Sequence, residues 1–154
     1  MARMPIEERF WSKVDKTSTC WEWTGAKVHN GYGVFSLPGN KQQVAHKFSF
    51  RLALGEVPEK MELDHTCHNR ACVRPDHLRL ATHKQNQENR TGAQTNAASG
   101  VRGVHRNGDK WRGAVRHNKK TYSAGRFADI ESAARAVEAL RLKLFTHNDL
   151  DRAA

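Results

Sequence analysis

Short apolar stretches alternate with polar turns along the first half of the chain. Apolar residues recur at helical spacing in "PIEERFWSKV". Three strand-like pieces follow, separated by Gly, Asn and Pro: "CWEWTGA", "GYGVFSL" and "QQVAHKF". "HKFSFRLALG" predicts a short helix that ends at Gly55. "MELDH" and "HLRLAT" predict two strands around a polar loop, and Thr82 with Gln85 fits a capping box that opens another helix, "HKQNQENR". The predicted local order is strand, loop, strand, helix.

The second half has a simpler pattern. "GVRGVHR", "KWRGAVR" and "KTYSAGRF" predict three short strands joined by tight turns. "ADIESAARAVEALRLKLF" predicts one amphipathic helix, whose apolar face consists of Ile130, Ala134, Val137, Leu140 and Leu144. A three-stranded antiparallel sheet covered by this helix is the economical arrangement, so the expected fold class is α+β.

Small and polar residues separate the two halves. The segment "RTGAQTNAASG", residues 90–100, has no apolar periodicity and is typical of a linker. We therefore expect a first domain over residues 1–92, a linker over residues 93–100 and a second domain over residues 101–154.

The balance of charged residues indicates which kind of partner the chain binds. The chain has 26 Lys and Arg against 16 Asp and Glu, and residues 101–126 alone hold eight basic residues against one acidic residue, Asp109. This balance favours a polyanionic partner, with nucleic acid ahead of an anionic membrane, because no apolar stretch approaches the roughly 20 residues of a membrane span. The start, "MARMPIEERFW", lacks the apolar core of a secretory signal. We expect a chain that is not secreted, whose three cysteines bind metal or are simply buried.

The segment "LDHTCHNRACVRPDHLRLAT", residues 63–82, holds two of those cysteines and three histidines. Cys67, Cys72 and His77 follow one another at intervals of five residues, and zinc prefers four thiolate or imidazole ligands. Cys20, the remaining cysteine, is the candidate fourth ligand. A structural zinc ion would stabilise a half that is poor in apolar residues, whereas the alternative is that the cysteines are buried small hydrophobic residues.

One histidine of this segment is a candidate for chemistry. His65 ends the predicted strand directly after Asp64, and Asn86 lies on the second turn of the following helix. Oxygen ligands such as these suit magnesium, and a neutral imidazole beside a hydrated divalent ion can activate water against a phosphodiester. From spacing alone, His65 could equally be a further zinc ligand or a loop histidine, and Asn86 a solvated helix residue.

The longer segment "LDHTCHNRACVRPDHLRLATHKQNQENR" resembles the ββα-metal motif of the HNH and His-Cys-box homing endonucleases of phages and introns. The resemblance implies that His65 is the general base and that Asp64 and Asn86 bind a catalytic Mg²⁺. It also implies a structural Zn²⁺ held by Cys20, Cys67, Cys72 and His77. The basic residue that contacts the scissile phosphate stays open, with Lys47 and Arg51 as candidates.

Residues 100–146 resemble the plant Apetala-two (ethylene-response) type of DNA-binding domain in "GVRGVHR", "KWRGAVR", "AGRF" and "SAARAVEAL". The resemblance implies a sheet that lies in the major groove of double-stranded DNA. The candidate contact residues are Arg102, Arg106, Lys110, Trp111, Arg112, Arg116, Lys120 and Arg126. Trp111 could instead lie in the core under the helix, and the basic face could be merely solvated.

Together these features predict a homing-type DNA endonuclease acting in the cytoplasm of a prokaryotic or phage-infected cell. A monomer with one active site would nick DNA, and a homodimer could break both strands. The alternative is a non-catalytic, zinc-stabilised DNA-binding regulator. An RNA-binding module ranks third, because the strands lack the aromatic pairs that stack on unpaired bases.

Overall fold

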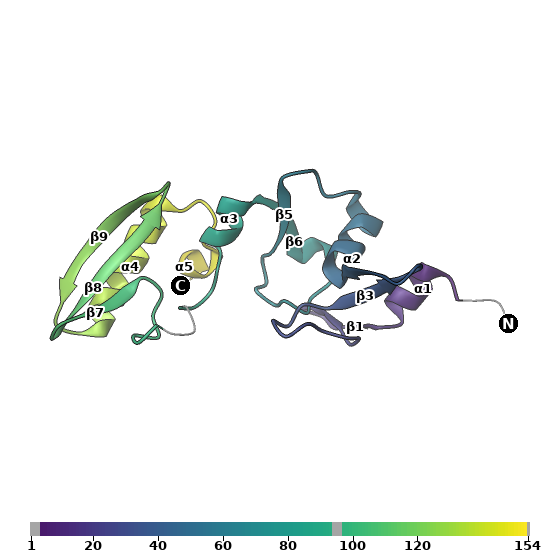
Figure 1. The fold of residues 1–154 in the computed structure, drawn as a ribbon, viewed down its shortest axis with the longest axis horizontal. Helices are drawn as coiled ribbons and strands as arrows, with labels where there is room; N and C mark the ends of the chain where they lie inside the picture. Colours follow the sequence, from purple (N-terminus) through teal and green to yellow (C-terminus); the bar gives the residue numbers. More distant parts are fainter. Residues whose placement is uncertain (1–3, 94–96, 154) are drawn as a thin grey trace. The chain divides into compact units, whose positions relative to one another are not determined.

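The computed structural model describes residues 4–93 and 97–153. The chain divides into two compact units, Met1–His83 and Lys84–Ala154 (Figure 1). The division lies before the boundary expected at residue 92, because Arg102 donates hydrogen bonds to the carbonyls of Gln87 and Glu88 and so ties these residues to the second unit. Of the expected linker, residues 93–100, the stretch 94–96 lies outside the described residues.

The first unit is built from short elements. In chain order they are α1 (Ile6–Trp11), β1 (Val14–Lys16), β2 (Trp21–Trp23), β3 (Val34–Leu37), β4 (Lys41–Val44), α2 (Ala45–Leu54), β5 (Met61–His65), the 3-10 helix η1 (Pro75–His77) and β6 (Leu78–Thr82). They form three antiparallel pairs, β1–β2, β3–β4 and β5–β6. The expected strand in "QQVAHKF" ends at Val44, because the chain enters α2 there; this helix ends at Gly55, whose φ of 94° favours glycine.

An aromatic core holds these elements together. Its buried residues are Phe10, Trp23, Phe35, Ala45, Phe48 and Val73. The Phe10 ring stacks on Trp23 at a centroid distance of 5.1 Å and packs against Phe48 at 4.8 Å. A side chain at Gly33 would collide with the Trp23 ring, so this glycine lets β3 approach the core. Helices α1 and α2 and strands β2 and β3 thus share one core, which Val73 of the loop between β5 and η1 (the cysteine loop) also joins.

β5 and β6 pair in the register that places His65 opposite Leu78 and Asp64 opposite Arg79. The helix α3 (His83–Glu88) follows β6 directly. The expected order of strand, loop, strand and helix is therefore present along the chain. Helix α3 is shorter than the predicted segment "HKQNQENR", and all of it beyond His83 belongs to the second unit.

The second unit contains the expected sheet and helix. Strands β7 (Val104–Asn107), β8 (Lys110–His117) and β9 (Lys120–Phe127) form an antiparallel sheet in the order β7-β8-β9, with an irregularity between Gly113 and Ala114. Helix α4 (Ile130–Leu144) runs along one face of the sheet (Figure 1). Asp129 caps α4 by accepting a hydrogen bond of 2.7 Å from the backbone N–H of Ser132.

The core between β7–β9 and α4 consists of Val104, Val115, Ala133, Val137 and Phe145. On the helix, Ala133 is fully buried, and the predicted Ala134 is only half-buried. A second helix, α5 (Asp149–Ala153), was not expected from the pattern. Within the described residues, no helix is long and apolar enough to cross a membrane.

Candidate metal and catalytic sites

Four side chains of the first unit converge on one point. The sulfur atoms of Cys20, Cys67 and Cys72 and a ring nitrogen of His77 all lie within 4.8 Å of one another. The Nδ1 atom of His77 is 3.7 Å from the sulfur of Cys20 and 3.6 Å from that of Cys72. A tetrahedral zinc site with ordinary bond lengths has sulfur–nitrogen separations of about 3.6 Å. The ligand types, their number and their spacing therefore fit zinc.

The backbone brings Cys20 to the cysteine loop. Trp21, the next residue, accepts a hydrogen bond of 2.8 Å from the N–H of Val73, and Trp23 donates one of 2.9 Å to the carbonyl of Ala71. β2 therefore lies beside the loop segment that carries Cys72. These contacts join residues about fifty positions apart in the sequence, which is why spacing alone could suggest Cys20 but not place it.

Two thiols of this cluster, those of Cys67 and Cys72, resist ionisation on their own. Burial raises the pKa of Cys72 to about 12, and burial is also the main cause that raises the pKa of Cys67. A thiolate is the form that binds metal, and a bound cation supplies the charge that a buried thiolate needs. Binding of a metal ion would therefore release protons from Cys67 and Cys72.

His65 lies beside this cluster but does not belong to it. Its side chain is buried, with 6% of the residue exposed, and its Nε2 atom is 3.0 Å from the backbone carbonyl of Cys72. Because a carbonyl only accepts hydrogen bonds, Nε2 carries the proton and Nδ1 has a free lone pair when the ring is neutral. Burial lowers the pKa of His65 and so favours this neutral form.

Two further rings pack around His65. The ring of His46 meets it edge-on at a centroid distance of 4.7 Å, and the ring of Tyr32 lies 5.9 Å away. Burial, followed by the charges of His65 and Lys47, lowers the pKa of His46 to about 3, so His46 is neutral. Neither ring was identified from the sequence as part of a site, because neither has a distinctive spacing; the only signal is the short segment "GYG" and the "AHK" at the start of α2.

Asp64 is buried next to His65 in β5. Its Oδ2 atom accepts hydrogen bonds from Nε of Arg79 at 3.0 Å and from Nη2 at 2.7 Å. This cross-strand pair balances a carboxylate whose side chain is only 7% exposed. Asp64, the predicted oxygen ligand of a catalytic metal, is thus held by Arg79, which was not among the residues predicted from the sequence.

The segment that holds Asp64, His65 and the cysteine loop matches a known protein family. The family described as HNH endonuclease matches residues 43–88, which contain α2, β5, the cysteine loop, β6 and α3. Residues 43–88 form an HNH endonuclease domain. The HNH domain includes all the predicted site residues of the first half except Cys20.

Two curated relatives come from Escherichia phage T7. Protein 2.8 is 32% identical over 85 residues, which cover 54% of this chain and 58% of the relative. Protein 7.7 is 36% identical over 69 residues, which cover 45% of this chain and 52% of the relative. The chain therefore spans about half the length of the curated relatives it matches. No solved structure matches.

The HNH domain ends in α3, whose later residues are held by the second unit. Glu88 is buried, and its Oε2 atom accepts hydrogen bonds from the N–H of Thr146 at 2.8 Å and from its hydroxyl at 3.1 Å. Asn86, which is half-buried, lies two residues before Glu88 in the same helix. Asn86 thus belongs to a helix that the C-terminal segment fixes within the second unit.

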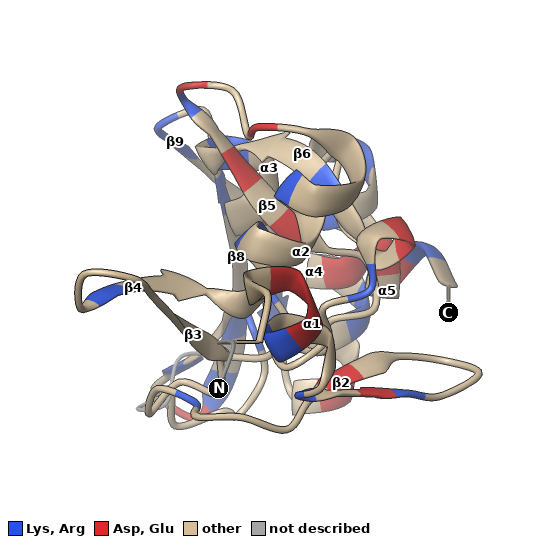
Figure 2. Ribbon diagram, turned by 90° about the vertical axis from the view of Figure 1, so that its right-hand side faces the viewer, with Lys and Arg blue, Asp and Glu red and all other residues tan. Residues whose placement is uncertain are grey.

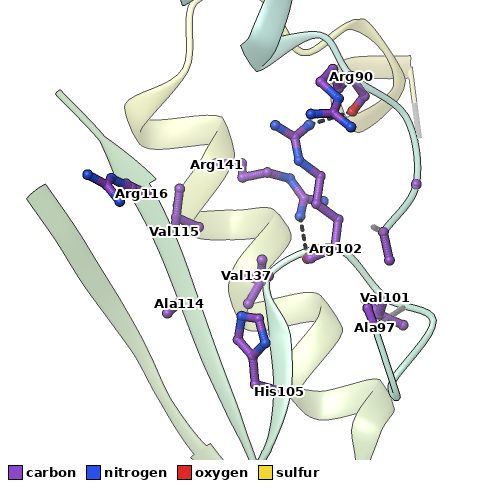
Figure 3. Close-up of a pocket in the computed structure, with 13 residues that line it drawn as sticks. Arg90, Ala97, Val101, Arg102, His105, Ala114, Val115, Arg116, Val137 and Arg141 are labelled. Carbon is purple, nitrogen blue, oxygen red and sulfur yellow. Dashed lines mark hydrogen bonds between the residues drawn. The ribbon is translucent and has the colours of Figure 1, made fainter. Parts of the chain in front are cut away.

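The candidate DNA-binding residues fall into groups with different surroundings. Arg102 is half-buried and precedes β7; its guanidinium donates to the carbonyls of Gln87, Glu88 and Arg90. Figure 3 shows it beside Arg141, which donates to the carbonyl of Arg102 at 3.1 Å, at the edge of a cavity of about 290 Å³. Arg141 also pairs with Asp151 at 2.6 Å. Both guanidinium groups therefore bind protein groups.

Trp111 lies on the face of the sheet that α4 covers, because it packs against the core of the second unit. The guanidinium of Arg106 stacks 5.0 Å from the centre of its ring. Trp111 therefore lies in the core under the helix, which is one of the two positions that the sequence left open. Arg106 covers the outer side of its ring.

The opposite face of the sheet is basic. His105, Arg112 and Arg126 pair across β7, β8 and β9 in one register row. Arg112 directly follows Trp111 in β8, so its side chain lies on the face opposite to that of Trp111. Lys and Arg residues recur along β8 and β9 (blue in Figure 2). The exposed candidates on this face are Lys110, Arg112, Arg116 and Arg126; Arg106 and Lys120 are also exposed, but they pair with Trp111 and His117 in rows of the covered face.

Proposed function

We propose that the chain is a metal-dependent DNA endonuclease of the homing type, in which His65 activates the attacking water. The observation that carries the proposal is the hydrogen bond of 3.0 Å between Nε2 of His65 and the carbonyl of Cys72. It leaves Nδ1 as the basic atom of a buried, neutral ring. The match of residues 43–88 to the HNH endonuclease family supports the same reading.

In the proposed reaction, Nδ1 of His65 takes a proton from water while the water oxygen forms a bond to phosphorus. The bond between phosphorus and the 3′ oxygen breaks, and that oxygen leaves as a 3′-hydroxyl once it is protonated from solvent. The other product ends in a 5′-phosphate. His65 then returns its proton to solvent, so the ring is neutral at the start of each turnover.

Asp64 and Asn86 are the proposed ligands of the catalytic Mg²⁺, because carboxylate and amide oxygens are the donors that this ion accepts. When bound, the ion would stabilise negative charge on the phosphate and on the leaving oxygen. Arg79 holds Asp64 through its Oδ2 atom. The separate proposed role of Cys20, Cys67, Cys72 and His77 is to bind a structural Zn²⁺.

The C-terminal sheet is proposed to bind the major groove of double-stranded DNA through the face opposite α4. Arg112, Arg116 and Arg126 are exposed on strands, without a carboxylate partner among the residues the structure describes. A flat ribbon of strands fits the major groove, and exposed arginines bind phosphates or guanine. In this division of labour the HNH domain cuts and the sheet positions it, and a monomer nicks one strand.

The decisive experiment is incubation of supercoiled plasmid with the full chain and Mg²⁺. We expect wild-type protein to convert plasmid to the nicked form and His65→Ala to lower the rate by about 1,000-fold, since general-base catalysis contributes roughly 10²–10⁴. His29→Ala, which changes an exposed histidine of the same unit, is the matched control. If wild-type protein retards the plasmid on a gel but never nicks it, the chain is the non-catalytic DNA-binding regulator instead.

A further inference from the structure

The arginines of the first unit differ in what holds them. Arg51 pairs with Glu56 at 3.6 Å, Arg74 with Asp76 at 3.0 Å and Arg79 with Asp64 at 2.7 Å. These three charges are therefore partly neutralised. Arg9 has no carboxylate in the described part of the chain, but it donates to the carbonyl of Ser36 and lies over the core residue Phe35.

Arg70 has a different environment. It is exposed, and Nη1 donates a hydrogen bond of 3.0 Å to the carbonyl of Asn30. Its guanidinium lies 5.7 Å from the centre of the Tyr32 ring. No carboxylate pairs with it among residues 4–93 and 97–153. The side chain is thus held in place by one bond and one ring while most of its donors stay available.

Tyr32 connects Arg70 with the proposed base. The ring of His65 lies 5.9 Å from that of Tyr32, so Arg70 and His65 both lie beside the same ring. Both residues belong to the loop that the bond from His65 to Cys72 closes.

We propose that Arg70 is the catalytic arginine that binds the non-bridging oxygens of the scissile phosphate. This inference rests on the proposed nuclease function and deepens it. A guanidinium offers parallel N–H donors that match two phosphate oxygens. As water adds to phosphorus, charge grows on these oxygens, and a fixed cation beside them stabilises the transition state more than the bound substrate.

The two earlier candidates for this role have weaker positions. Arg51 is paired with Glu56, and its guanidinium also lies 5.1 Å from the centre of the Phe48 ring. Lys47 is exposed on α2, and its ammonium cannot form the two-pronged contact that a guanidinium provides. The loop arginine is therefore the better donor on geometry.

The test is single-turnover nicking of supercoiled plasmid by the full chain, with protein in saturating excess and Mg²⁺ present. We expect Arg70→Ala to lower the saturated rate by about 100-fold, the typical effect of removing one transition-state donor. Plasmid affinity without added Mg²⁺ should change by less than about threefold, since a single phosphate contact is lost among many. Arg70→Lys should recover only part of the rate.

Chemical rescue separates a catalytic role from a structural one. Added guanidinium at concentrations below those that unfold the protein should raise the rate of Arg70→Ala and leave that of wild-type protein unchanged. Melting temperature and zinc content of Arg70→Ala should equal those of wild type. Lys41→Ala, which changes an exposed basic residue of β4 in the same unit, is the matched control, and its rate should stay within about twofold of wild type.

Several outcomes would overturn the assignment. If wild type nicks, His65→Ala does not, and Arg70→Ala nicks within threefold of wild type, Arg70 is not the phosphate ligand although the nuclease function stands. A loss shown by Lys47→Ala or Arg51→Ala in its place moves the role to that residue. If wild type fails to nick at all, the proposed function fails, and the role of Arg70 fails with it.

Discussion

The guanidinium of Arg102 donates a hydrogen bond of 3.0 Å to the backbone carbonyl of Glu88. A residue just before the first strand of the C-terminal sheet thus caps the last turn of α3, the helix that carries Asn86. The last carbonyls of a helix have no partner within the helix, so a charged donor at this position stabilises it. The end of the HNH domain therefore depends on residues that follow it in the chain.

Replacing Arg102 should loosen α3. We expect Arg102→Ala to lower the free energy of unfolding of the second unit by about 2 kcal/mol, because a charged donor leaves several carbonyls. Hydrogen exchange should accelerate at the amides of residues 85–90 and hardly at those of β8. Arg112→Ala, on the exposed face of β8, should leave both quantities unchanged. Equal effects of the two variants would contradict the capping role.

Truncation after residue 92 should abolish nicking rather than merely weaken DNA binding. The fragment keeps α3 but loses Arg102, Thr146 and His147, which hold Glu88 and the end of the helix. An isolated helix of six residues is unstable in water. Plasmid nicking at saturating fragment concentration measures this, and a fragment that cuts at the rate of the full chain would show that α3 folds without these partners.

Acid should destabilise the second unit through Glu88. Burial would raise the pKa of Glu88, but the donors of Thr146 and His147 outweigh it, so the pKa lies below its ordinary value of 4.5. A carboxyl whose pKa is lowered by folding contributes stability that is complete above its unfolded pKa and is lost as pH falls through its folded pKa. The melting temperature should therefore fall as pH drops below about 4.5, and Glu88→Gln should show a lower melting temperature at pH 7 and a smaller fall.

Removing one ligand of the proposed zinc site should lower zinc affinity on the order of 100-fold or more, because a site with three protein ligands is no longer closed. Cys20→Ser is the informative variant, since it lies far from the loop in sequence. A competitive zinc indicator measures the affinity, and a melting curve reports the first unit. Stoichiometric zinc at wild-type affinity would exclude Cys20, whereas zinc removal from wild type should unfold the first unit.

The exposed face of the sheet should dominate the salt dependence of DNA binding. Arg126→Ala removes one cation of the row formed with His105 and Arg112, so the slope of log affinity against log salt should decrease by about 1. Arg102→Ala should leave this slope unchanged, because its guanidinium binds carbonyls of the protein. Fluorescence anisotropy with a labelled duplex at several salt concentrations measures both slopes.

The metal cluster was the most predictable part of the site. Thiolates and imidazoles at intervals of five residues have few uses other than metal ligation, and the structure brings Cys67, Cys72 and His77 together with Cys20. His65 could be named from its place at the end of a strand, but the atom proposed to act as base could not. That atom depends on the carbonyl of Cys72, and backbone carbonyls carry no sequence signal.

Alternation along strands was less reliable where the backbone leaves extended geometry. Strict alternation would put Arg102 on the same face as Val104 and Arg106, but Gly103 has a φ of 83° and turns the chain just before β7 begins. Arg102 consequently points to α3. The short helix α5 escaped detection because side chains such as Arg152, which donates to the carbonyl of Phe145, hold it in place instead of an apolar stripe.

Cys72 contributes its sulfur to the cysteine and histidine cluster and its carbonyl to the ring of His65. The two contributions place different demands on any replacement at this position. Another metal-binding side chain could take over from the sulfur, but no side chain can substitute for a main-chain oxygen. An engineer who redesigned the cluster for a different ion would therefore have to preserve the path of the chain here before choosing the ligands.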